Sequence, residues 1–249
     1  YRPALEPSHL VRTDEDATIA QGDKLSGERY LAAATIAEVV QANGGRCAVA
    51  GTKSAALLHN RNPVARSGNV TVFEGNTLPS SALAAVVQAI GPFPQKKSVP
   101  NIAEDAWTTG ALTEVLWQEG VPEFSLLWMS EPDRAQHASG PGSPDAIAGI
   151  KSADANLAVV IRALAEKKVL DHTDILVVSD HGFSTISRAV DLAALLSEAG
   201  FLSLALQPRP AARSASAEMA APFSSTSASM IEPRRSAWWN GCNTPISLA

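Results

Sequence analysis

The chain of 249 residues is long enough for one large domain or two small ones, and its 45% hydrophobic content suffices for a sizeable core. A formal net charge of −5 argues against a nucleic-acid-binding protein, so we expect no nucleic-acid polymer as a partner. No run of about eighteen apolar residues is present, so we expect no transmembrane helix. Cys47 and Cys242 could form one disulfide, but they are too few and too far apart to make a disulfide framework.

The N-terminal half predicts alternating strands and helices. Residues 1–29 are polar and lack periodicity, which predicts an extended loop. Residues 29–45 have apolar positions at helical spacing, and the short apolar run 46–52 predicts a buried strand. Residues 69–75 predict another strand, and "SSALAAVVQAI" before Gly91 predicts a helix.

The alternation continues to about residue 201. Residues 108–122 predict a helix capped by Thr108 or Thr109, and 123–130 predict a strand buried on both faces. A long amphipathic helix is predicted over 143–170, with Ser143 as its cap. The apolar run 174–179 predicts the next buried strand, and residues 186–201 predict a helix. Buried strands that alternate with helices predict an α/β fold, a parallel sheet sandwiched by helices.

The character of the sequence changes near residue 207. We expect residues 1–206 to form one partial domain and 207–249, which are rich in Ala, Ser and Pro, to form an irregular tail. We hypothesise that the tail is frame-shifted. Tryptophan has a single codon, and "SAWWNGCNTPISLA" read one base earlier permits an amphipathic helical pattern, while the same shift lets "APFSSTS" read as a strand. Early stop codons in the alternative frame of the parent DNA would refute this.

Two apolar runs stop abruptly at acids and a histidine. Asp133 and His137 follow "LLWMS", and Asp180 and His181 follow "ILVVS". One predicted helix separates the two runs, so a right-handed crossover would place both carboxyl ends at one edge of the sheet. Carboxylates and imidazoles suit zinc, with manganese and iron as alternatives. An isolated Asp-His pair is usually an ordinary loop, but the two motifs together predict a metal site.

The same stretches carry a family resemblance. "WMSEPDRAQHASGPGSP" followed by "ILVVSDHGFS" resembles the type I phosphodiesterase and nucleotide pyrophosphatase family of the alkaline phosphatase superfamily. The likeness covers mainly residues 121–205, with looser agreement over 30–60. It implies an alkaline-phosphatase-like αβα sandwich, a small-molecule phosphate ester as substrate, two zinc ions, and a periplasmic or extracellular location. It also implies that Asp133 and His137 bind one ion, and that Asp180 and His181 bind the other.

The chain departs from the family's pattern in three places. The family's first metal-binding Asp, its Thr or Ser nucleophile and a late histidine have no match, and no histidine follows His181. We therefore expect a fragment that lacks the nucleophile segment and the C-terminal part and is inactive or weakly active as given. If the chain proves fully active, Thr13, Thr18 or Ser130 would have to supply the nucleophile. His59 fits no motif and is expected to be solvated.

Other functions remain open at this stage. A sulfatase or a phosphomutase of the same superfamily would share the metal motifs, and the missing nucleophile is what would discriminate among them. A non-catalytic metal-binding or interaction module is the alternative from a different class. Arg134 and Gln136 lie between the proposed ligands, and they could contact a phosphate or be solvated loop side chains. The sequence identifies no substrate-binding residue.

Overall fold

The computed structural model describes residues 16–27, 30–60 and 69–200 of the chain. Its sheet has the strand order β3-β2-β1-β4. The strands are β1 (Cys47–Gly51), β2 (Val70–Phe73), β3 (Asn76–Leu78) and β4 (Phe124–Trp128). β1 pairs in parallel with both β2 and β4, whereas β3 pairs antiparallel with β2. The predicted α/β class, an αβα sandwich of alkaline-phosphatase type, is confirmed, with an antiparallel edge strand that the sequence analysis did not include.

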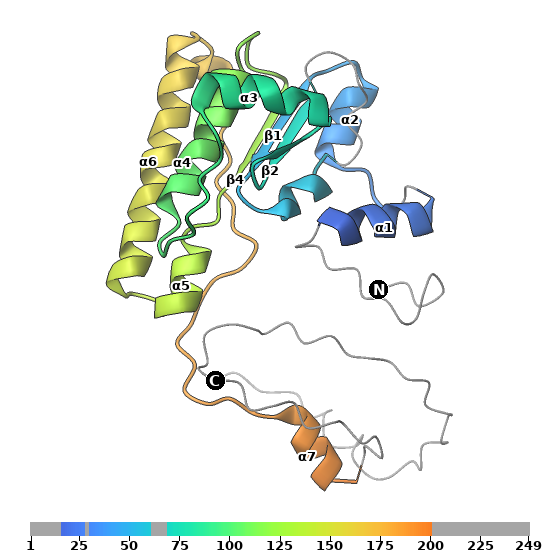
Figure 1. Cartoon of the computed structure of the whole chain (residues 1–249), viewed down its shortest axis with the longest axis vertical. Helices are drawn as coiled ribbons and strands as arrows, with labels where there is room; N and C mark the ends of the chain where they lie inside the picture. Colours follow the sequence, from blue (N-terminus) through green and yellow to red (C-terminus); the bar gives the residue numbers. More distant parts are fainter. Residues whose placement is uncertain (1–15, 28–29, 61–68, 201–249) are drawn as a thin grey trace, which may run out of the picture. The chain divides into compact units, whose positions relative to one another are not determined.

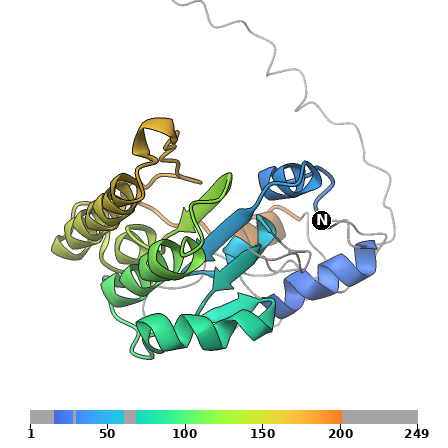
Figure 2. The ribbon, with the colours of Figure 1, turned by 90° about the horizontal axis from the view of Figure 1, so that it is seen from above.

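Helices cover both faces of the sheet (Figures 1 and 2). The described helices are α1 (Asp16–Ser26), α2 (Ile36–Ala42), α3 (Leu83–Ile90), α4 (Ile102–Gly110), α5 (Asp133–Ser139), α6 (Pro144–Glu166) and α7 (Leu192–Glu198), and those that supply core residues against the sheet are α1, α2, α3, α4 and α6. Short turns of 3-10 helix occur at η1 (Ser54–Leu58), η2 (Ser80–Ala82) and η4 (Leu170–His172), and α4 continues as a π-helix, η3 (Ala111–Leu116). None of the described helices is long and apolar enough to cross a membrane.

Alternate residues of β1 explain the two layers, because successive side chains of a strand point to opposite faces. Ala48 and Ala50 pack in one core with side chains of α3, α4, η3 and α6, among them the buried Leu112 and Leu164. Val49 packs in a second core with side chains of α1 and η1. Small residues on β1 allow the large helices of the first layer to lie close to the strand.

Several predicted elements are confirmed with shorter bounds. The strands predicted at 46–52, 69–75 and 123–130 appear as β1, β2 and β4, and the long helix appears as α6. The Ser143 hydroxyl accepts a hydrogen bond from the Ala146 amide, 3.1 Å away, as a helix cap does. β4 was expected to be buried on both faces but is only half-buried. Among the described residues it pairs with β1 alone, so its other edge has no strand against it.

The predicted caps Thr108 and Thr109 are wrong. The helix begins earlier, at Ile102, and both threonines lie inside it. The Thr108 hydroxyl donates to the Glu104 carbonyl at 2.9 Å, and the Thr109 hydroxyl donates to the Asp105 carbonyl at 2.8 Å. A threonine that bonds the carbonyl four residues back satisfies its hydroxyl within the helix, so it needs no capping position.

The strand predicted over 174–179 is also wrong. These residues form neither helix nor strand, and Leu176, Val177 and Val178 are 81%, 77% and 83% exposed. An apolar run shows that a segment is suited to a strand, but a strand forms only where its backbone groups find a pairing partner. The described structure provides no such partner for this segment.

Several further expectations are corrected by the structure or concern residues outside the described ranges. α1 lies where an extended loop was predicted, and α2 and α7 are each only 7 residues long, shorter than the helices predicted there. Cys47 is a free, buried thiol whose pKa is raised by burial, and Cys242 lies outside the described residues, as do Thr13 and the tail 207–249. The boundary predicted at 206/207 therefore stays a prediction.

Candidate metal centre

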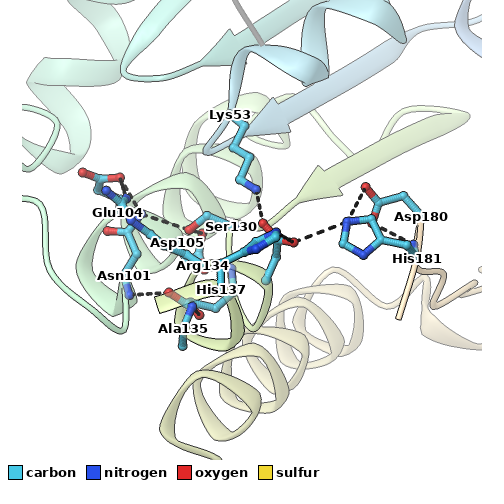
Figure 3. A network of polar contacts seen from close by, with 12 residues as sticks. Lys53, Asn101, Glu104, Asp105, Ser130, Arg134, Ala135, His137, Asp180 and His181 are labelled. Atoms are coloured by element: carbon cyan, nitrogen blue, oxygen red, sulfur yellow. Dashed lines mark hydrogen bonds and ion pairs between the residues drawn. The ribbon is translucent and has the colours of Figure 1, made fainter. Parts of the chain in front are cut away.

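The carboxyl ends of β1 and β4 bring distant parts of the sequence together. The two strands are parallel and in register, with Gly51 opposite Trp128, so the residues that follow them emerge at the same edge. Lys53 follows β1, and Asp133 opens α5 after β4. The Lys53 ammonium lies 2.6 Å from the Asp133 Oδ2 atom, and the two side chains are 40% and 26% exposed (Figure 3).

α5 places His137 over Asp133. Residues four apart lie on one face of a helix, one turn from each other. The His137 Nε2 atom lies 3.4 Å from Asp133 Oδ1, the carboxylate oxygen that does not face Lys53. The sequence motif predicts that these two residues share one ion, and the short helix α5 brings them close enough to do so.

His181 completes a group of three. Its Nε2 atom also lies 3.4 Å from Asp133 Oδ1, although the strand predicted before it is absent. Ligand atoms of Asp133, His137 and His181 all lie within 4.8 Å of one another. Asp180 lies at the margin of this group, with a side chain that is 59% exposed and an Oδ2 atom 3.8 Å from His181 Nε2. The family resemblance pairs His181 with Asp180, whereas in the structure His181 lies close to Asp133 and His137 as well as to Asp180.

The group fits a divalent cation. Asp133 Oδ1 is shielded from solvent and accepts no hydrogen bond in the described structure, which is costly for a carboxylate oxygen. Ligand atoms about 2.0–2.1 Å from a tetrahedral zinc ion lie roughly 3.3–3.4 Å from each other. Both imidazole nitrogens are at this separation from Oδ1. Two histidines and one carboxylate are also a ligand set that catalytic zinc uses.

Two residues near the group, Lys53 and Phe183, are not among the candidates that the sequence analysis named. Lys53 is eighty positions before Asp133, so only the sheet register brings it near. Phe183 contacts both imidazoles, with ring centroids 4.8 Å from His137 and 5.2 Å from His181. Its place directly after "SDHG" is the one local signal that could have indicated a role. The aromatic ring packs against both imidazoles and restricts their orientation.

Other candidates from the sequence have structural roles. The Ser130 hydroxyl is buried, donates to Asp105 and accepts from the Asn101 side chain, so it is not free to act as a nucleophile. Arg134 lies 3.6 Å from the Glu104 carboxylate rather than on the open side of the group. His59, expected to be solvated, is half-buried against Trp128, and burial lowers its pKa.

Comparison with known proteins supports the resemblance. The sequence profile of the family described as "Type I phosphodiesterase / nucleotide pyrophosphatase" matches residues 3–234. A venom phosphodiesterase of Naja atra is 32% identical over 66 residues, which are 26% of this chain and 8% of the venom protein. Ectonucleotide pyrophosphatase/phosphodiesterase family member 7 of Homo sapiens is 29% identical over 91 residues, which are 36% of this chain and 20% of the human protein. No solved structure matches.

The curated relatives are much longer than the aligned segment, since the match spans at most about a fifth of each of these two proteins. The family profile, in contrast, matches most of this chain, from residue 3 to residue 234. It includes both motifs that place Asp133, His137 and His181 together. The chain belongs to the type I phosphodiesterase/nucleotide pyrophosphatase family.

Proposed function

We propose that this chain takes part in metal-dependent hydrolysis of phosphate esters, of the phosphodiesterase or nucleotide pyrophosphatase type. The proposal rests on the Asp133 carboxylate, whose buried Oδ1 atom faces two imidazole nitrogens and accepts no hydrogen bond. Asp133, His137 and His181 would hold one divalent cation, and their imidazole and carboxylate ligands suit zinc. Such an ion would stabilise negative charge on the oxygens of a phosphate ester.

The second ion of the proposal would involve Asp180. This carboxylate lies beside His181 and is well exposed, so it can reach a cation on the open side of the group. The family resemblance assigns two zinc ions, one to each motif. Sharing of ligands between neighbouring ions is compatible with His181 lying between Asp133 and Asp180. The substrate would be a small-molecule phosphate ester, acted on in an extracellular or periplasmic setting.

The chain's own residues would prepare the site in three ways. Phe183 would restrict the rotation of both imidazoles. α5 would hold Asp133 and His137 one helical turn apart, so that their ligand atoms converge. Lys53 would add a positive charge on the side of Oδ2, where it would favour the approach of an anionic ester. We expect slow turnover by the chain as given, because Ser130 is engaged in buried hydrogen bonds and no nucleophile is assigned.

The experiment compares hydrolysis of bis-p-nitrophenyl phosphate and p-nitrophenyl sulfate by the full chain with added zinc chloride. We expect zinc-dependent release from the phosphate diester, little from the sulfate, and loss of activity in Asp133→Asn and His181→Ala. The matched controls Asp154→Asn and His172→Ala change exposed residues outside the group and should keep wild-type rates. Preferential sulfate hydrolysis would favour a sulfatase. Zinc binding without any hydrolysis would favour the non-catalytic module.

A further inference from the structure

Three carboxylates are buried where α4 meets the turn between β4 and α5. Glu104, Asp105 and Glu131 are 5%, 0% and 4% exposed. Acidic side chains are rarely buried this fully unless several hydrogen bonds or an opposite charge compensate for lost hydration. The hydrogen-bond partners of Asp105 and Glu131 indicate the structural role of the cluster.

Both carboxylate oxygens of Asp105 accept hydrogen bonds from the turn between β4 and α5. Its Oδ1 atom accepts hydrogen bonds from the Ser130 amide at 2.7 Å and the Ser130 hydroxyl at 3.0 Å. Its Oδ2 atom accepts from the Glu131 amide at 3.0 Å. Figure 3 shows Asp105 beside Ser130. Two of these three donors are backbone groups, so the carboxylate fixes the path of the chain at residues 130 and 131.

Glu131, whose backbone Asp105 holds, is in turn hydrogen-bonded to the first turn of α5. Its Oε1 atom accepts from the Asn101 amide at 2.6 Å, and its Oε2 atom accepts from the Ala135 amide at 3.0 Å. Pro132 makes no side-chain cap at the start of α5, so Glu131 satisfies one of the open amides of the first turn. Asp133 thus lies between two anchored positions, Glu131 on one side and Ala135 on the other.

We infer that Asp105 is a positioning residue for the proposed metal centre, holding Asp133 in place through the backbone of Ser130 and Glu131. The inference rests on the proposed function, because it concerns the ligand geometry of the same site. No contact joins Asp105 to Asp133, His137 or His181 in the described structure. Asparagine at position 105 would place an NH₂ group where one of the oxygens now accepts from a backbone amide, and it would remove the charge that strengthens the remaining bonds.

The test is the zinc affinity of the full chain, measured by competition with a chromogenic chelator for wild type, Asp105→Asn and Thr113→Val. Thr113 is a matched control: it is buried on the same helical run, and its hydroxyl donates only to the Thr109 carbonyl, at 3.0 Å. Loss of a residue that orients metal ligands typically costs about 10–100-fold in affinity. We expect a loss of this size in Asp105→Asn and less than a twofold change in Thr113→Val, with urea unfolding recorded for both.

The outcomes separate the inference from the proposed function. Wild-type zinc affinity in a folded Asp105→Asn variant would overturn the role of Asp105 and leave the metal centre standing. Absence of zinc binding by the wild type would overturn both. If Asp105→Asn does not fold, amide hydrogen exchange measured on the wild type tests the inference instead. We expect strong protection of the Ser130 and Glu131 amides with and without zinc, and fast exchange there would overturn the inference.

Discussion

The two oxygens of Asp133 have different partners: Oδ2 lies 2.6 Å from the Lys53 ammonium, and Oδ1 faces the imidazoles of His137 and His181. One carboxylate therefore joins a cation of the protein to the proposed metal centre. A bound divalent ion and the ammonium would repel each other across this carboxylate, so Lys53 is expected to weaken metal binding.

Lys53→Met should therefore raise zinc affinity. Partly exposed ion pairs contribute up to about 1 kcal/mol, which corresponds to a two- to roughly fivefold increase. The measurement is a chelator competition titration at low ionic strength, with Lys97→Met, an exposed lysine outside the group, as the control. Weaker zinc binding by Lys53→Met would show that the lysine orients Asp133 rather than competing for it.

Gly149→Ala should destabilise the protein, although alanine is normally the better helix former. A Cβ atom at Gly149 would lie 2.8 Å from Glu131 Oε2, and both oxygens of Glu131 are held by hydrogen bonds. Overpacking of this kind costs about 1–3 kcal/mol. At Gly110 the nearest atom to an added Cβ is 3.5 Å away, so Gly110→Ala should gain about 0.5–1 kcal/mol. Urea unfolding of the two variants gives the comparison, and equal stabilisation by both would contradict the tight contact.

Leu176→Thr tests whether residues 174–179 are exposed, as in the structure, or form the buried strand that the sequence pattern predicts. Leu176 is 81% exposed, so its substitution should change the free energy of unfolding by less than about 0.5 kcal/mol. Leu112→Ala, in the core at 2% exposure, should cost about 2–5 kcal/mol. If Leu176→Thr proves as costly as Leu112→Ala, residues 174–179 form the buried strand that their sequence predicts.

His59 should make stability depend on pH. Burial lowers its pKa below that of the unfolded chain, so the unfolded state binds the proton more readily. The stability contributed by the neutral ring is fully present above about pH 6.5 and is lost as the pH falls through the lower, folded-state pKa. Urea unfolding at about pH 7.5 and pH 5 should show a smaller loss in His59→Phe, which keeps a ring against Trp128, than in the wild type. An equal loss in both proteins would assign the pH dependence to other groups.

The elements that the sequence predicts well are those with local signals. Ser143 and Pro144 mark the start of α6, and Gly91 ends α3, because caps and stops act within one helical turn. The unpaired segment 174–179 was mispredicted because pairing depends on residues far away in the sequence. α5 was not recognised as a helix because its seven residues are mostly polar and too few to show periodicity.

The residues of the candidate site also fall into those with a local sequence signal and those without one. Asp133, His137 and His181 are visible in short motifs that end apolar runs, and the structure brings them together. Lys53 and Asp105 lie in no such motif: Lys53 contacts Asp133 only because β1 and β4 are neighbours in the sheet, and Asp105 contacts the turn before Asp133 only because α4 packs against it. Residues that contact or support the site through tertiary structure alone cannot be found from their spacing in the sequence.

Calorimetric titration of zinc into wild type, Asp133→Asn, His137→Ala and His181→Ala, with His172→Ala as the control, tests directly whether the three residues form one metal centre. Each of the first three substitutions should weaken the same binding event by at least about tenfold, because each removes one of three ligands. His172→Ala should bind as the wild type does. Unchanged zinc binding by His181→Ala would contradict the central claim that His181 joins Asp133 and His137 in one metal centre.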